Sequence, residues 1–321
     1  MELPSSDVRR GLVRAYAAVL ESLELESHGR PIVLPNGEFF PDPFTGDGAS
    51  VQRLLDRLLE HAGLSDMAIS ARLVGEPADA SCGTGACGSC GPTPEAEPEN
   101  VERLVDAGDA WQINVLPKEV GQPVALSSAL CRAVALAVLC EADHRPKGVE
   151  LELAIDLSAV ALGYGVLLLE GSHIYRKSCG GPAVSRTTTL GPTELALVLA
   201  LSAAVNDQPR TKVGKYLSPT QQEAFAEAAA WADSNPALAQ SLRRAPERIA
   251  LGEFELKEAT SWLGRWVART LSRPKTAEAA LTIEDLETAL ENSNVARPPS
   301  QKPRDPKLEE IRRLVDEALS E

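Results

Sequence analysis

Apolar residues recur at helical spacing along much of the chain, and the clearest case is residues 48–64. The apolar positions of this stretch are Val51, Leu54, Leu55, Leu58 and Leu59. Steps of three or four residues place side chains on one face of a helix, so the stretch predicts an amphipathic helix that stops at Gly63. The same spacing predicts a helix over residues 6–25.

Three later stretches are apolar on nearly every side, which is typical of helices buried in a core. They cover residues 125–142, 148–172 and 191–207. Further helices are predicted over residues 218–234, 253–271 and 282–291, and short strands over 67–75 and 110–117. These elements predict a mainly helical α+β fold with few short strands and a helical C-terminal extension.

Residues 30–50 are dense in proline and glycine, which predicts an ordered loop with one short strand at Ile32–Leu34. Three of the chain's five phenylalanines lie in this segment, namely Phe39, Phe40 and Phe44. A solvated linker would not concentrate aromatic residues, so we expect the loop to pack on the core.

The C-terminal part changes to a polar, proline-rich composition at residues 292–306, which predicts a linker. An amphipathic helix is predicted after it, over residues 307–321, with an apolar face formed by Leu308, Ile311, Leu314, Val315 and Leu319. A helix of this length is marginal alone, so we expect that face to bind a protein partner or the chain's own domain. The remaining predicted parts are an N-terminal helical segment (1–26), a core (27–245) and a helical extension (246–291).

Composition narrows the range of partners and the compartment. The chain has 321 residues and a formal net charge of −14, which argues against nucleic acid as a partner because an acidic surface repels phosphate. The first residues lack the apolar centre of a secretion signal, and no apolar run is expected to reach the roughly 18 residues of a membrane span. The sequence therefore predicts a cytoplasmic protein without membrane insertion, whose cysteines are reduced.

Three cysteines, Cys82, Cys87 and Cys90, lie in a glycine-rich loop over residues 78–100. Their C-x4-C-x2-C spacing is the one with which plant-type ferredoxins begin to ligate a [2Fe–2S] cluster. A cluster or a zinc site needs a fourth ligand, and the next cysteine is Cys131, inside a predicted buried helix. The alternatives are a plain loop, a zinc or [2Fe–2S] site, and a thiol redox site. The sequence does not identify a small-molecule ligand or exclude one.

Residues 31–64 resemble a segment of a little-characterised family of bacterial proteins, with the pattern P-x-V-x-P-x-x-E-F-F-P-D-P-Y-x-G before a leucine-rich helix. In that family a later helix carries a HELAH-type motif, and the next carries E-x-x-x-D and a Gly-Tyr/Phe-Gly step. Residues 152–166, ELAIDLSAVALGYGV, are similar to this last helix. The layout resembles a gluzincin metallopeptidase, which implies a zincin-like core.

The resemblance implies a site that has lost its metal ligands. Glu152 stands where the third zinc ligand would be, and Asp156 where a carboxylate would orient a histidine. The two histidine positions hold Cys131 and Ala135, and the position of the catalytic base holds Arg132. We therefore expect no catalysis and no zinc here, and an ion pair from Arg132 to Glu152 or Asp156. The alternative is that both carboxylates face solvent.

The function that this resemblance implies is that of an inactive peptidase-like scaffold or a protein-interaction module. Two alternatives stay open, and both use the cysteine loop. One is a metal or [2Fe–2S] binding protein, and the other is a thiol redox protein.

Overall fold

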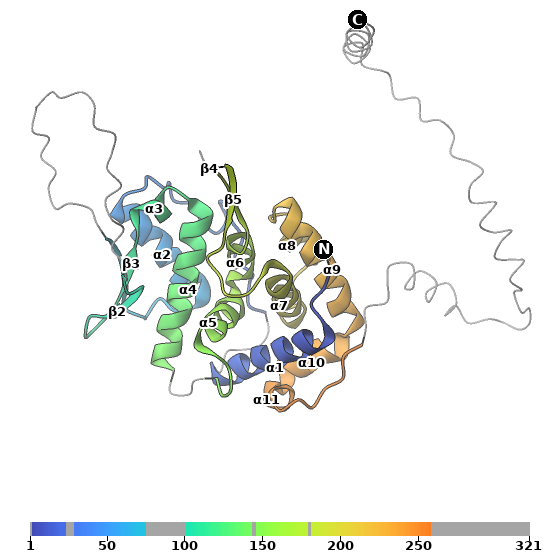
Figure 1. Cartoon of the computed structure of the whole chain (residues 1–321). Coiled ribbons are helices and arrows are strands. Elements are labelled where there is room, and N and C mark those ends of the chain that lie inside the picture. The colour runs from blue at the N-terminus through green and yellow to red at the C-terminus, as the bar shows by residue number, and fades with distance from the viewer. Residues whose placement is uncertain (1, 24–28, 75–100, 143–145, 179–180, 258–321) are drawn as a thin grey trace, which may run out of the picture. The chain divides into compact units, whose positions relative to one another are not determined.

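A layer of apolar helices forms the centre of the fold (Figure 1). Helix α4 (Pro123–Glu141) packs along a broken helix, whose first part is α5 (Leu151–Ala159) and whose last part is α6 (Gly165–Gly171). Helix α7 (Pro192–Val205) packs on α6 and on α9 (Pro219–Ser234). The apolar stretches predicted to be core helices are confirmed as such.

The computed structural model describes residues 2–23, 29–74, 101–142, 146–178 and 181–257. These residues belong to one compact unit, which covers residues 1–261. The cysteine loop with Cys82, Cys87 and Cys90 lies outside the described residues. So do the predicted helix 282–291, the linker 292–306 and the terminal segment 307–321.

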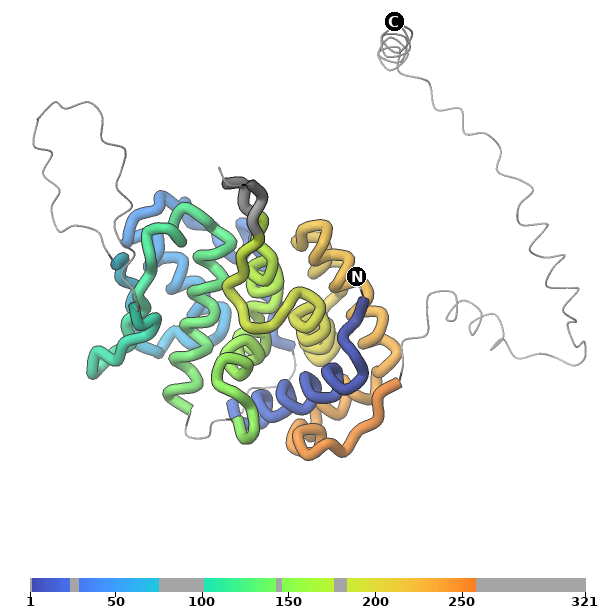
Figure 2. Tube along the Cα trace, viewed as in Figure 1, coloured from blue at the N-terminus to red at the C-terminus, as the bar shows by residue number. Residues whose placement is uncertain are grey.

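Helix α1 (Ser6–Ser22) packs against α5, α7 and the short helix α11 (Pro246–Ala250). Figure 2 shows this N-terminal helix lying beside the last described segment of the chain. Two further short helices, α8 (Arg210–Gly214) and α10 (Pro236–Arg244), pack around α7 and α9. The described residues 253–257 are not helical, so the predicted helix 253–271 is wrong over that part.

A small mixed sheet packs beside α2 (Gly48–Ala62), which begins at an Asp47 cap and ends at Gly63 in the left-handed conformation. Strand β1 (Ile69–Leu73) pairs in parallel with β3 (Trp111–Val115), so the two predicted strands are confirmed. Strand β2 (Leu104–Asp106) pairs antiparallel with β3 on its other edge, and the single-turn helix α3 (Pro117–Val120) follows.

A two-stranded antiparallel hairpin follows α6 and was not predicted. Its strands are β4 (Ile174–Ser178) and β5 (Gly181–Ser185), and Tyr175 lies opposite Val184 in the register. Both of these side chains are exposed. The hairpin leads into the residues that connect to α7.

The helix predicted over residues 148–172 is interrupted by a π turn at Val160–Tyr164. Gly163 has a φ of +99° there, and its carbonyl accepts a hydrogen bond from the Val33 amide at 2.9 Å. The buried segment Ile32–Leu34 is therefore no strand, because the Val33 amide bonds to the helix break and not to another strand. The predicted strand at this place is wrong.

The aromatic loop packs on the core, as expected, through Phe39. This side chain is 7% exposed, and its ring meets His61 edge-on with centroids 4.9 Å apart. His61 Nε2 also lies 2.8 Å from the Phe39 carbonyl oxygen, so α2 holds the loop at two points. Phe44 is left 42% exposed.

Two helical stretches, Pro123–Glu141 and Leu151–Gly171, are long and apolar enough to cross a membrane by length and composition alone. The expectation that no segment reaches that length was therefore wrong, since the few charged residues in them do not interrupt the apolar runs. In the described chain 61% and 83% of their apolar windows are buried against other elements. Core helices pack in this way, and the cytoplasmic location stays a prediction.

Replacing Gly163 by alanine is expected to destabilise the fold by about 2 kcal/mol or more. The positive φ of Gly163 favours glycine, and the added Cβ would clash with a backbone carbonyl oxygen. That oxygen is the Pro31 carbonyl, 2.6 Å from the place that the added methyl would take. Gly11→Ala in α1 is the matched control: nothing lies within 4 Å of its added Cβ, so the helix should gain up to about 1 kcal/mol. Urea denaturation measures the change in the free energy of unfolding for both variants. Equal changes would contradict the claim that the helix break requires glycine at position 163.

Candidate functional site

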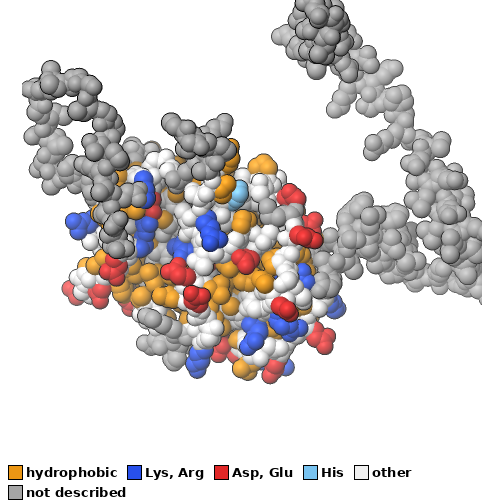
Figure 3. Space-filling model, viewed as in Figure 1, with side chains coloured by type: hydrophobic (Ala, Val, Ile, Leu, Met, Phe, Trp, Pro, Cys, Tyr) orange, Lys and Arg blue, Asp and Glu red, His pale blue; other side chains and the backbone are white. Residues whose placement is uncertain are grey.

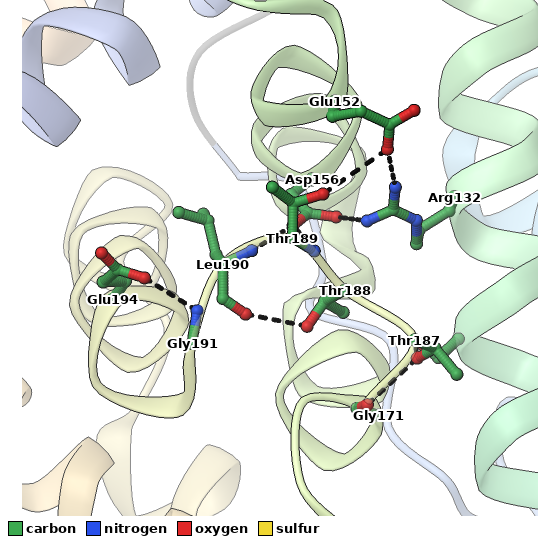
Figure 4. Close-up of polar contacts among 11 residues, drawn as sticks. Arg132, Glu152, Asp156, Gly171, Thr187, Thr188, Thr189, Leu190, Gly191 and Glu194 are labelled. Carbon is green, nitrogen blue, oxygen red and sulfur yellow. Dashed lines mark hydrogen bonds and ion pairs between the residues drawn. The ribbon is translucent and has the colours of Figure 1, made fainter. Parts of the chain in front are cut away.

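Arg132 of α4 bridges two carboxylates of α5 (Figure 4). Its Nη2 lies 2.5 Å from Glu152 Oε2, and its Nη1 donates to Asp156 Oδ1. The exposed side-chain fractions are 15% for Arg132, 56% for Glu152 and 0% for Asp156. The expected ion pair is therefore present, and it includes both carboxylates rather than one.

The geometry follows from helix periodicity. Glu152 and Asp156 are four residues apart and share one face of α5, which packs against α4. Arg132 comes from an otherwise apolar part of α4, at the level of this pair. One planar guanidinium can donate to two acceptors at once, so it can satisfy both carboxylates where a lysine would offer one point charge.

The second oxygen of Asp156 is also satisfied. Asp156 Oδ2 accepts hydrogen bonds from the backbone amides of Thr189 and Leu190, each at 2.8 Å. Burial raises the pKa of Asp156, and Arg132 and the two amides oppose that rise. A buried carboxylate with these partners is stable only as long as all of them stay in place.

The loop that supplies these amides, residues 186–191, is fixed at several other points. Thr187 Oγ1 lies 2.7 Å from Ser128 Oγ and 3.0 Å from the Gly171 carbonyl oxygen. Thr189 Oγ1 lies 3.5 Å from Glu152 Oε2. The loop is thus joined to α4, α5 and α6 before α7 begins, and Figure 4 shows most of these contacts together.

The other two positions of the predicted degenerate site do not belong to this cluster. Cys131 and Ala135 are both fully buried in the core that α4 shares with its neighbours. Burial raises the pKa of the Cys131 thiol well above its ordinary value. Cys131 is therefore a protonated core residue.

Among the described residues, no group of three or more His, Cys, Asp or Glu side chains could hold a metal ion. The Arg132 guanidinium neutralises Glu152 and Asp156, whose negative charge would otherwise attract a metal ion. Cys82, Cys87 and Cys90 are not among the described residues, so the cluster, zinc and redox interpretations of that loop stay predictions.

Two cavities lie elsewhere on the described chain, and neither is lined by Arg132, Glu152 or Asp156. One of about 730 Å³ lies between α1, α11 and residues 147–149. The other, of about 450 Å³, lies between the loop 35–44 and the helices α2, α4 and α6. Part of the lining of the second cavity comes from residues 31–64, the segment that carries the resemblance to the bacterial family.

Sequence reasoning missed the loop 186–191 as part of the site. Its contribution to Asp156 comes from backbone amides, which any residue type except proline could supply. The run of three threonines before the Gly-Pro start of α7 is the one signal present in the sequence, since threonine hydroxyls often bond to nearby backbone groups.

Comparison with known proteins adds no relative: no family model, no curated protein and no solved structure matches the chain. The family resemblance and the zincin-like layout therefore rest on the residues alone.

Replacing Arg132 by methionine removes the charge and keeps most of the side-chain volume. Asp156 would then be buried without its cation, and we expect a loss of about 3–5 kcal/mol in the free energy of unfolding. The control is Arg248→Met, because Arg248 and Glu253 form an ion pair with exposed fractions of 68% and 52%. That exposed pair should contribute less than about 1 kcal/mol. Equal losses in urea denaturation would contradict the proposed importance of Arg132.

The deficit of Arg132→Met should also depend on pH. Without Arg132 the pKa of Asp156 rises further, because the charge that opposed its rise is gone. A carboxyl with a raised folded-state pKa stabilises the fold at low pH and loses that contribution as the pH rises through the folded-state pKa. The deficit is therefore largest near neutral pH and shrinks toward about pH 4. A deficit that grows on acidification would contradict this assignment.

Proposed function

We propose that the chain is a non-catalytic protein with a zincin-like core, which serves as a scaffold or protein-interaction module in the bacterial cytosol. The observation that carries the proposal is the position of Arg132 between Glu152 and Asp156. In a gluzincin the corresponding carboxylates would bind zinc and orient a histidine, and the arginine position would hold the base.

The chemistry of the cluster supports an inactive site. A metallopeptidase needs a Lewis acid and a general base, and Arg132 is a permanent cation that can be neither. The nearest thiol position, Cys131, is buried and has a raised pKa, so it is not a nucleophile at neutral pH. With these residues the cluster holds three structural segments together. Its exposed carboxylate, Glu152, is paired with Arg132, and the cluster itself contains neither of the two histidine ligands that a gluzincin uses to bind zinc.

An interaction role is favoured by the chain's other features. The sequence pattern of residues 307–321 predicts a helix with an apolar face formed by Leu308, Ile311, Leu314, Val315 and Leu319, and such a face needs a partner surface. Figure 3 shows charged side chains of both signs scattered over the visible face, which suits a surface in water. The net charge of −14 argues against nucleic acid as the partner.

The cysteine loop supplies the two other candidate functions. Cys82, Cys87 and Cys90 have the spacing of three ligands for zinc or a [2Fe–2S] cluster, and the same thiols could undergo redox exchange. Either function could exist beside an inactive core. A test for bound metal therefore has to distinguish the cysteine loop from the Glu152–Asp156 cluster.

Metal analysis of the protein purified from cells supplied with zinc and iron distinguishes these two candidate sites. A variant with Cys82→Ser, Cys87→Ser and Cys90→Ser should carry far less than one metal ion per chain. Metal that is present in the wild type and absent from this variant would assign a site to the loop. Metal that survives in the cysteine variant and is lost when Glu152→Gln is added would contradict the inactive core.

Substitution of the terminal apolar face tests the interaction role. We expect the double variant Ile311→Asp, Leu314→Asp to lose the partners that the wild type captures from its own cells, because two charges break the apolar face. The control is Glu310→Gln, Glu317→Gln, which changes charge outside that face and should keep them. Quantitative mass spectrometry after cross-linking measures the recovery. Equal recovery with all three proteins would rule out this segment as the docking element.

A further inference from the structure

The cavity of about 450 Å³ beside the loop 35–44 has the size of a small-molecule site. Most of its walls are apolar, formed by Pro35, Phe40, Pro43, Phe44, Leu54, Pro123, Leu126 and Leu167. They come from the loop, α2, α4 and α6, so distant parts of the sequence converge on one space. Phe44 is exposed over 42% of its surface although it forms part of this wall.

The segments that line the cavity are fixed by hydrogen bonds and ring contacts. The Asn36 side chain lies 3.0 Å from the Tyr216 hydroxyl, and its oxygen accepts from the amides of Glu38 and Phe39. Phe40 meets the ring of His61 edge-on, with centroids 6.0 Å apart. A preformed wall of rings costs little ordering when a ligand binds.

The polar groups of the cavity are largely engaged within the chain. Ser50 Oγ bonds to the backbone at Gly46 and Asp47, and Ser127 Oγ to the Pro123 carbonyl. Arg57 is paired with Asp42 at 2.8 Å and with Glu60 at 2.7 Å. These groups are therefore not the ones to recognise a ligand.

Arg53 differs from them. It lines the cavity and makes no hydrogen bond or ion pair with the residues that the structure describes, and its charge adds to the effect of Arg57 in lowering the pKa of Asp42. Three charged residues line the cavity, and two of them, Arg57 and Asp42, are paired with each other, so Arg53 carries the charge that is left without a partner among the described residues. An anionic group is the complement of that lining.

We propose that this cavity binds a small aromatic molecule that carries one anionic group, such as an aryl carboxylate. The rings of Phe40 and Phe44 and the prolines around them contact the flat apolar part. The carboxylate accepts hydrogen bonds from the Arg53 guanidinium at the rim. The site is independent of the Arg132 cluster and does not rest on the proposed inactive core.

Isothermal titration of the full-length protein with 2-naphthoate tests the proposal, with 2-naphthamide as a neutral analogue of nearly equal shape. We expect one naphthoate per chain, and about five- to tenfold weaker binding of the amide because it lacks the charge. Decanoate distinguishes an aryl from an acyl ligand, and it should bind more weakly than 2-naphthoate.

Variants at exposed positions locate the site without threatening the fold. Arg53→Gln should bind 2-naphthoate about as weakly as the wild type binds the amide, whereas Arg72→Gln, at another exposed arginine, should bind normally. Phe44→Ala should weaken the binding of both ligands several-fold. Tyr175→Ala is the control, because Tyr175 is 59% exposed and does not line the cavity, and it should leave binding unchanged.

Three results would overturn the proposal. The first is an absence of 2-naphthoate binding at about 5 mM, far above the affinity of a built site. The second is binding that is unchanged in Phe44→Ala, which would place the ligand elsewhere. The third is equal binding of acid and amide, or tighter binding of decanoate, which would remove the anionic or the aromatic part of the assignment.

Discussion

A carboxylate without exposed surface sets the strongest constraint on this structure. Asp156 lies within an apolar helix layer, where an unpaired charge would cost several kcal/mol. Its donors offset that cost: Arg132 binds one oxygen, and the amides of Thr189 and Leu190 bind the other. The positions of α4, α5 and the loop before α7 are therefore linked through one side chain.

The helix break at Gly163 is a second constraint, and it connects the core to the aromatic loop. The carbonyl of Gly163 accepts a hydrogen bond from the Val33 amide, and this fixes the segment Ile32–Leu34 in the core. The loop that follows is then held by His61 and Tyr216, so its outer side forms one wall of the cavity near Arg53. The Arg132 cluster and the cavity both use α4 but share no residue, which is why one could be altered without the other.

Periodicity was sufficient to predict the core helices and the pairing of Glu152 with Asp156 on one face, because residues four apart on a helix share a face whatever the tertiary structure. It could not predict the amides of Thr189 and Leu190, since backbone donors leave no mark on residue type. The break at Gly163 was equally hidden, because it depends on the distant Pro31 and Val33 approaching the helix. The same holds for the cavity, whose walls come from four separated segments.

The energy that couples Arg132 to Asp156 tests the central claim most directly. A double-mutant cycle with Arg132→Met, Asp156→Asn and the combined variant gives that coupling from three unfolding measurements against the wild type. A buried, directly bonded pair predicts a coupling of about 2 kcal/mol or more in the stabilising direction. A coupling below about 0.5 kcal/mol would show that the two residues act independently and that the core does not depend on their contact.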